Sequence, residues 1–257
     1  MTSRVKRIII WFLGFFYLFP FGYLLLLSLS GTWRFPRMLP AELTLQHWQQ
    51  ILSVQGDITE SFLLTITISV SVAFMSTAAG FLTSKAIAQH RFRKTFMLMS
   101  YFPFILSPVI YAACIYYYFI KFDLSGNIMG VILGQLIIAY PYAVIIFSGF
   151  WNKRLNSMEN LVSTLGGSSF QAYMRVLLPM AKGMLLICFF QTFLISWFEY
   201  GLTVIIGVGK VQTLTLKVYQ YINDANIYYA ALSSCLLILP PVILIFINNK
   251  FVMKNKI

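Results

Sequence analysis

Long apolar runs alternate with short polar segments along the chain. Each run approaches or exceeds the roughly 20 residues that a helix needs to cross the hydrocarbon core of a bilayer. This pattern predicts an all-α polytopic membrane protein with six transmembrane helices. The runs extend from Ile8 to Trp33, Ser61 to Ser84, Thr95 to Ile120, Leu124 to Asn152, Gly183 to Phe198 and Ala225 to Asn249.

Two of these runs contain features that break the apolar pattern. The third run contains Pro103 and Pro108, which free backbone carbonyls in mid-membrane and allow a bend. The fifth run is short before Glu199 but stays apolar from Tyr200 to Gly209, so we expect one span with an embedded acid.

The first run exceeds the 7 to 15 apolar residues typical of a signal peptide and is expected to be a retained helix.

Composition and charge support a membrane protein and give it an orientation. Of the residues, 59% are hydrophobic and 10% are charged, against about 25% charged residues in soluble domains. Lys and Arg concentrate in cytoplasmic loops, and with both termini in the cytoplasm most of the 19 cations fall inside. The inner cations are Arg4, Lys6, Arg7, Lys85, Arg91, Arg93, Lys94, Lys153, Arg154, Arg175, Lys182, Lys250, Lys254 and Lys256, and the outer ones are Arg34, Arg37, Lys121, Lys210 and Lys217.

The same residues argue against several other classes of protein. The net charge of +12 is spread over separate inner segments without a basic face, so no nucleic-acid partner is expected. Catalytic motifs and metal-ligand spacings are missing, and the sequence contains two histidines, His47 and His90. The three cysteines lie singly in apolar runs. The sequence therefore predicts no catalytic residue, no metal and no cofactor.

A polar stretch from Asn160 to Pro179 separates the fourth and fifth runs. Asn156 or Ser157 is expected to cap a short helix that Gly166 and Gly167 interrupt, and Ser168 to cap a second helix. The second helix carries Phe170, Tyr173 and Met174 on one side, and Pro179 is expected to start the fifth span. Such an apolar side outside the bilayer predicts a groove on another protein as its partner.

This stretch resembles the cytoplasmic signature of permease subunits of binding-protein-dependent ABC importers, and the loop Gly207 to Gln220 resembles a region of such permeases in the polyamine, thiamine, iron and phosphonate branches. Leu165-Gly166 is followed thirteen residues later by Pro179, as in that signature, while Asn160 stands where the family has an acid. The segment LTLQHW, Leu43 to Trp48, also resembles the family's loop before the second span. The resemblance implies a type I permease fold, with 1–257 as one transmembrane domain.

By the same resemblance, residues 156–179 are the coupling stretch that an ATPase subunit binds. The implied coupling residues are Asn160, Leu161, Val162, Leu165, Gly166, Gly167, Ser168, Phe170, Tyr173, Arg175 and Pro179. The resemblance further implies a second permease subunit, identical or related, a periplasmic or lipid-anchored solute-binding protein, and the bacterial inner membrane as location.

A candidate translocation path follows from polar or helix-breaking residues inside the runs: Ser107, Pro108, Gln135, Tyr142 and Glu199. Helix packing through Gly126, Gly130 and Gly134 is an alternative role for the face that bears Gln135. For Glu199, a functional role and an interfacial ion pair with Lys210 or a partner subunit both stay open.

The expected function is therefore that of a non-catalytic pore subunit of an ATP-driven importer of a small solute, of the polyamine, thiamine, phosphonate or iron class. A secondary transporter driven by an ion gradient is the alternative. It would need intramembrane carboxylates, and Glu199 is the single candidate.

Overall fold

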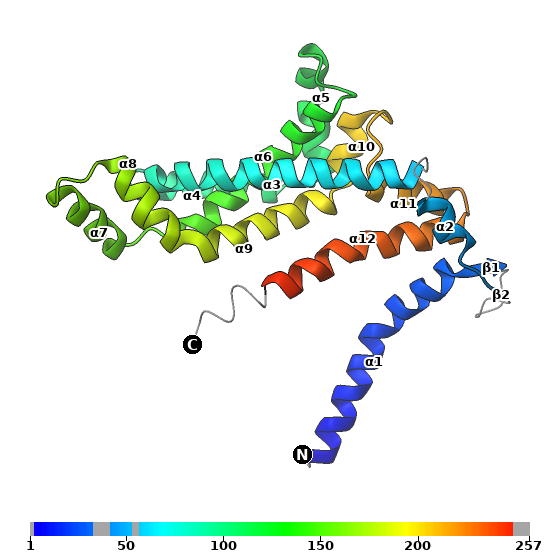
Figure 1. Ribbon diagram of the computed structural model, residues 1–257. Helices are drawn as coiled ribbons and strands as arrows, with labels where there is room; N and C mark the ends of the chain where they lie inside the picture. Colours follow the sequence, from blue (N-terminus) through cyan, green and yellow to red (C-terminus); the bar gives the residue numbers. More distant parts are fainter. Residues whose placement is uncertain (1–2, 33–41, 53–56, 249–257) are drawn as a thin grey trace. The chain divides into compact units, whose positions relative to one another are not determined.

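The computed structural model describes residues 3–32, 42–52 and 57–248 (Figure 1). The chain forms two compact units, one made of Met1–Leu64 with Gln212–Val242 and the other of Thr65–Val211 with Ile243–Ile257. Among the cations used for the topology prediction, Arg34, Arg37, Lys250, Lys254 and Lys256 lie outside the described residues.

Helices long and apolar enough to cross a membrane recur through the described residues, and the prediction of an all-α polytopic membrane protein is confirmed. Five such helices occur there, or six if a pair of helices bent by 99° is counted as one span. The five segments are Ile9–Ser28, Asp57–Gln89, Ile128–Ser148, Ser169–Trp197 and Ile227–Ile247.

The first unit combines the N-terminal part of the chain with the segment Gln212–Val242. It contains α1 (Ser3–Ser28), a short antiparallel pair of β1 (Ser30–Thr32) and β2 (Glu42–Leu43), then α2 (Gln46–Leu52) and α11 (Leu214–Asn223). Helices α3 (Asp57–Gln89) and α12 (Ile227–Asn248) each run through both units.

Aromatic and charged side chains hold the loop elements of this unit. The indole Nε1 of Trp48 donates to Ser28 Oγ at 3.3 Å, and the His47 ring stacks on Tyr228 with 5.5 Å between ring centroids. Lys217 Nζ lies 3.6 Å from Asp57 Oδ2. Burial, with Asp57 as a nearby negative charge, raises the pKa of the Tyr221 hydroxyl.

The second unit contains the remaining helices around one apolar core. After α3 come α4 (Arg93–Tyr101), the 3₁₀ turn η1 (Phe102–Phe104), α5 (Pro108–Lys121), α6 (Ile128–Ser148), α7 (Lys153–Thr164), α8 (Ser169–Ala172), the π-helical turn η2 (Tyr173–Leu177), α9 (Leu178–Trp197) and α10 (Gly201–Gly207). The core residues are Phe81, Ala143, Phe147, Trp151, Leu155, Leu177, Ala181 and Cys188.

Small residues bring the helices of this core close together. A Cβ built on Gly80 of α3 would lie 2.5 Å from the Ala143 Cβ of α6, so these helices touch through their backbones. On α6, a Cβ at Gly134 would lie 2.6 Å from Leu202 Cδ2 of α10. The predicted packing face is thus correct for Gly134, whereas Gly130, although buried on α6, lies against the carbonyl of Leu124 in the preceding loop, and the prediction is wrong for Gly126. Gly126 lies in the preceding loop with φ +75°.

The third predicted span is broken. Helix α4 with η1 and helix α5 meet at an angle of 99° across the residues before Pro108. Pro108 lacks an N–H and forces an extended conformation on the residue before it, and Ser107 has ψ 139°. The bend predicted at the prolines is therefore a complete interruption of the helix.

The fifth predicted span ends earlier than the sequence indicated. Helix α9 stops at Trp197, and the apolar residues after Glu199 form the separate helix α10. The expectation of one span from Gly183 to Gly209 is therefore wrong. The physical reason is that the Glu199 carboxylate binds backbone N–H groups of the next turn, which starts a new helix there.

Candidate functional site

The predicted coupling segment, residues 156–179, belongs to α7, α8, η2 and the start of α9, and Figure 1 shows α7 and α8 at one end of the second unit. Helix α7 begins earlier than predicted. Asn152 is its N-cap, because it is extended and its Oδ1 accepts a hydrogen bond from Leu155 N at 3.1 Å. The prediction of Asn156 or Ser157 as the cap is wrong, since both lie inside the helix.

Two glycines end α7 as predicted. Gly166 has φ +79°, a conformation that side chains with a Cβ rarely adopt. Its N–H donates to Ser163 O, and Gly167 N–H donates to Val162 O at 2.9 Å, which is the hydrogen-bond pattern of a Schellman turn. A Cβ at Gly167 would lie 2.5 Å from Val162 Cγ1, so this position also has no room for a side chain.

The second helix starts at Ser168, as the sequence predicted. Ser168 Oγ accepts from Gln171 N at 3.2 Å, and Gln171 Oε1 accepts from Ser168 N at 3.0 Å. These reciprocal bonds form a capping box. The turn between the two helices is thus fixed by its own residues, from Gly166 to Gln171.

The segment continues into the membrane without a break. Residues 169–197 form one helix, in which the π turn η2 precedes Pro179. A proline ring collides with the carbonyl four residues earlier, here Arg175, and a π turn is one way a helix accommodates this. Pro179 lies at the second position of α9, close to the predicted start of the span, but the helix before it is continuous with α9.

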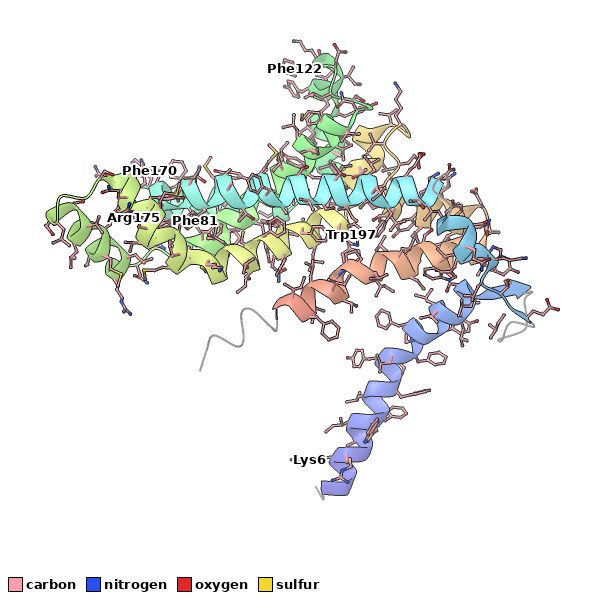
Figure 2. The ribbon with its side chains drawn as sticks, viewed as in Figure 1. Lys6, Phe81, Phe122, Phe170, Arg175 and Trp197 are labelled. Atoms are coloured by element: carbon pink, nitrogen blue, oxygen red, sulfur yellow. The ribbon has the colours of Figure 1, made fainter. Side chains whose placement is uncertain are left out.

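The coupling segment has an inner and an outer face. On the inner side, Leu177 is 1% exposed and packs in the core. On the outer side, three large apolar side chains are open: Leu161 is 60%, Leu165 78% and Phe170 68% exposed. Figure 2 shows Phe170 and Arg175 at the end of the unit where α8 lies. Asn160 and Arg175 are also exposed, whereas Val162 and Tyr173 are half-buried.

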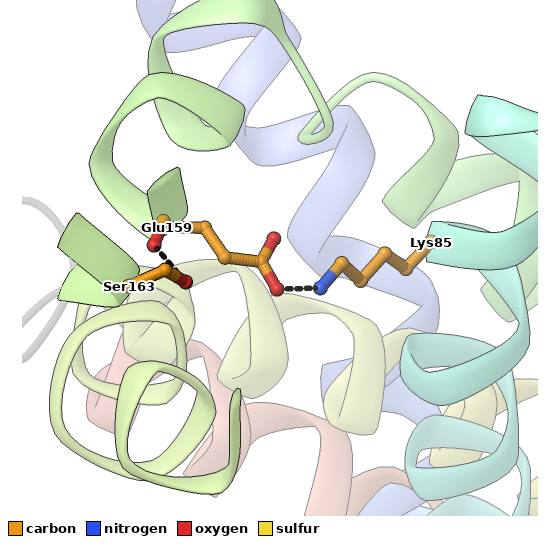
Figure 3. A network of polar contacts seen from close by, with 3 residues as sticks. All are labelled: Lys85, Glu159 and Ser163. Atoms are coloured by element: carbon orange, nitrogen blue, oxygen red, sulfur yellow. Dashed lines mark hydrogen bonds and ion pairs between the residues drawn. The ribbon is translucent and has the colours of Figure 1, made fainter. Parts of the chain in front are cut away.

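An ion pair that the sequence did not predict connects this segment to the long helix α3. Lys85 Nζ lies 2.6 Å from Glu159 Oε1, and both side chains are 22% exposed (Figure 3). Lys85 Nζ also lies 5.9 Å from the centre of the Trp151 ring, and Trp151 Nε1 donates to Ser84 Oγ at 2.8 Å. One sequence signal could have indicated the pair, since Glu159 is the single acid between Asp123 and Glu199.

Among the candidate path residues, the structure brings Gln135 and Glu199 together in a buried polar chain. Gln135 Nε2 donates to Thr203 Oγ1 at 3.0 Å, and Thr203 Oγ1 donates to Glu199 Oε2. At the other end, Ser196 Oγ donates to Gln135 Oε1 and lies 3.2 Å from Ser69 Oγ. We call these five residues the polar chain. It links α3, α6, the end of α9 and α10, and sequence reasoning missed Ser69, Ser196 and Thr203.

Glu199 occupies the break between α9 and α10. Its Oε1 accepts from Leu202 N at 2.6 Å and its Oε2 accepts from Thr203 N at 2.9 Å. A carboxylate at a helix N-terminus is favoured by the unpaired N–H groups and the helix dipole. Glu199 therefore acts here as a helix cap, while the predicted alternative partner Lys210 lies beside Gly126.

The other three candidate path residues are not members of the polar chain. Ser107 and Pro108 are exposed at the start of α5. Tyr142 is half-buried on α6, and its ring lies 6.0 Å from the ring of Phe104, in the turn before Ser107. Among the described residues no group of three or more His, Cys, Asp or Glu side chains could hold a metal ion.

Comparison with known proteins agrees with this architecture. Residues 74–254 match the family described as "Binding-protein-dependent transport system inner membrane component". The inner membrane ABC transporter permease protein YcjP of Escherichia coli (strain K12) is 20% identical over 245 residues, which cover 91% of this chain and 88% of the relative.

Two further relatives carry names that include a transported solute. The maltose/maltodextrin transport system permease protein MalG of Photorhabdus laumondii is 25% identical, with 93% of this chain and 88% of the relative covered. A putative 2-aminoethylphosphonate transport system permease protein, PhnV of Salmonella paratyphi A, is 24% identical, with 84% of this chain and 81% of the relative covered. The family match spans more than half of the chain, including the coupling segment and four of the spans that the sequence predicted. This chain belongs to the family of binding-protein-dependent transport system inner membrane components, the permeases of ABC importers.

Proposed function

We propose that this permease is driven by an ATPase subunit that binds its coupling segment, residues 156–179. The observation that carries the proposal is the exposure of Leu161, Leu165 and Phe170 around the hydrogen-bonded turn between α7 and α8. Exposed apolar side chains on a short helix are recognised by a hydrophobic groove on a partner protein. ATP hydrolysis then takes place on that partner, and this chain supplies half of the pore and no catalytic group.

The remaining parts of the transporter follow from this role. Because one coupling segment binds one ATPase, a second permease chain, identical or related, completes the pore with a second ATPase. A periplasmic or lipid-anchored binding protein delivers the solute from the opposite side. Both termini then lie in the cytoplasm, and residues 1–257 act as one transmembrane domain.

For the solute, we propose a small polar molecule of the phosphonate or sugar class. The names of PhnV and MalG support these two classes, of which the sequence had suggested the phosphonates. The polyamine, thiamine and iron classes receive less support from the described spans. Glu199, the acid between α9 and α10, already accepts hydrogen bonds from Leu202 and Thr203, which leaves fewer lone pairs to coordinate a cation. The same geometry counts against a secondary transporter that would use this carboxylate as its ion site.

A substitution on the outer face tests the ATPase contact. We expect Phe170→Asp to abolish co-purification of an ATPase in mild detergent, because a charge on the apolar docking face must be desolvated without a partner. Phe122→Asp is the matched control, since Phe122 is also an aromatic residue, 67% exposed, outside the coupling segment. Figure 2 shows Phe170 on α8 and Phe122 just after the end of α5. Equal ATPase recovery with both variants would contradict the proposal.

A further inference from the structure

Beyond the docking itself, the geometry points to Glu159 as a positioning residue. We propose that its ion pair with Lys85 fastens α7 to α3, so that the coupling segment and α3 move as one body and the surface offered to the ATPase carries no acid. This inference rests on the proposed ATPase contact and adds a role for two residues to which neither the family match nor the resemblance gives one.

The first support is the place of the ion pair. Lys85 Nζ and Glu159 Oε1 are 2.6 Å apart, with 22% of each side chain exposed, so water screens the pair less than it screens a surface pair. Lys85 also lies over the ring of Trp151, the residue just before the N-cap of α7. That indole donates to Ser84, the neighbour of Lys85. Two polar contacts thus attach adjacent residues of α3 to α7. Ser84 contacts Trp151, just before α7, and Lys85 contacts Glu159, in the middle of α7.

The second support is the fold of the segment around Glu159. Leu155, one turn before Glu159 on α7, is buried in the core, and Val162, about one turn after it, is half-buried against Gly167. Glu159 therefore lies on the inner face of α7. Leu161, two positions further on, points away from it and is exposed. Because of this spacing along the helix, the Glu159 side chain points away from the outer face that carries Leu161.

The third support is charge. Glu159 is the single acid between Asp123 and Glu199, and it is engaged with Lys85. At the position of the family's acid stands Asn160, which is exposed and neutral. The outer face of α7 therefore offers apolar side chains, the amide of Asn160 and the exposed cation of Arg154, which lies about two turns before Leu161 on the same side of the helix. The partner that fits this face is an ATPase whose groove is lined by apolar and polar groups, with no arginine required opposite Glu159.

The fourth support is mechanical. Helix α3 has 33 residues and is long enough to cross the membrane, so a displacement of α7 that reaches Lys85 is passed to a membrane-spanning helix. The contact between Glu159 and Lys85 joins α7 to α3, and the ring of Phe81, also on α3, packs against Trp151 and Tyr173. Without the ion pair, we expect a movement of the ATPase to displace α7 more than α3, so that the distance between the two helices changes.

Spin labels can test whether α7 and α3 move together. Labels at Ala86→Cys on α3 and Thr164→Cys on α7, both exposed positions, are introduced after the three native cysteines are replaced by serine. The distance distribution is measured by pulsed electron resonance on the complex purified with its ATPase, without nucleotide and after trapping with Mg-ATP and orthovanadate. We expect one narrow distribution that is the same in both states, and in Glu159→Gln a distribution that broadens or shifts on trapping. A parent chain whose distance shifts on trapping, or a variant that behaves like the parent, would overturn the proposal.

Two further variants test whether a change in the measured distance comes from loss of the ion pair. The swap Lys85→Glu with Glu159→Lys should restore the narrow distribution, and failure to restore it would show that the pair is not what holds the helices. Arg154→Gln is the control for loss of a charge on α7, because Arg154 is exposed, and it should behave as the parent.

Recovery of the ATPase distinguishes this proposal from the proposed function. Glu159→Gln should retain the ATPase, because the acid lies on the inner face. Loss of the ATPase in Glu159→Gln with an unchanged distance would make Glu159 a docking residue and overturn the positioning role. A parent chain that purifies without any ATPase would instead contradict the proposed function.

Discussion

Glu159 and Glu199 are both partly buried carboxylates, but their hydrogen-bonding partners differ in kind. Glu159 pairs with Lys85 of another helix, 74 residues away along the chain. Glu199 binds the N–H groups of residues three and four positions later. A contact distant in sequence ties two parts of the molecule together, whereas a local contact determines where one helix ends and the next begins. The comparison separates residues that transmit motion from residues that shape the bundle.

The local contact should contribute more to stability. Glu199→Leu leaves the N–H groups of Leu202 and Thr203 and the Thr203 hydroxyl without their acceptor, at roughly 1–3 kcal/mol for each buried unsatisfied group. We expect a loss of about 3 kcal/mol, which lowers the unfolding midpoint by about 6–12 °C for a chain of this size. The measurement is thermal unfolding followed by tryptophan fluorescence in detergent. Glu199→Gln keeps one acceptor oxygen and should lose about half as much. Equal losses would show that charge, not capping, is what counts at this position.

A steric change in the coupling segment should have an intermediate effect. Gly167→Ala places a Cβ 2.5 Å from Val162 Cγ1, and we expect about 1–2 kcal/mol of destabilisation from overpacking. Adding Val162→Ala removes the blocking methyl group and should recover part of this loss. Gly149→Ala is the control, because the nearest atom to its Cβ would be 3.9 Å away and no strain is expected. Hydrogen exchange across residues 153–172 measures the effect where it occurs, and protection that stays unchanged in Gly167→Ala would contradict the packing argument.

The ion pair should matter less for stability than for coupling. We expect Lys85→Met to cost about 1 kcal/mol, because Glu159 keeps partial access to water and the pair is partly screened. The double variant Lys85→Met with Glu159→Met should be close to the parent in stability, since replacing both members leaves no unpaired charge. The unfolding midpoints of the two single variants and the double variant form a cycle that measures the interaction. A cycle that closes with no coupling energy would mean that the pair does not connect the helices in solution.

The smallest change in stability is expected at the outer face. Phe170→Ala removes a ring that is 68% exposed, so the unfolding midpoint should shift by less than the equivalent of about 0.5 kcal/mol. The affinity for the ATPase should nevertheless fall about 30-fold, as for a contact worth about 2 kcal/mol at the centre of an interface. Titration of the detergent-solubilised chain with the purified ATPase measures this. A large fall in the midpoint would place Phe170 in the core and not at the docking face.

Local rules and apolar length, both readable from the sequence, determined much of this protein. Apolar length gave the helical membrane class. Local rules gave the glycine turn at Gly166 and the cap at Ser168, because these depend on residues within a few positions of each other. The Asn156 or Ser157 cap failed because Asn152 offered the same chemistry four or five residues earlier. A capping pattern alone does not rank two possible starts.

Contacts between distant residues were decided by the tertiary structure alone. Apolar length cannot distinguish one span from two helices, so the break at Glu199 appears only when its carboxylate is seen on the N–H groups of α10. Nothing in the spacing of Lys85 and Glu159 predicts their ion pair, because it depends on where α7 packs against α3. The sequence thus specified which segments form helices, and packing specified which polar groups meet, since a buried charge must find a partner wherever the fold provides one.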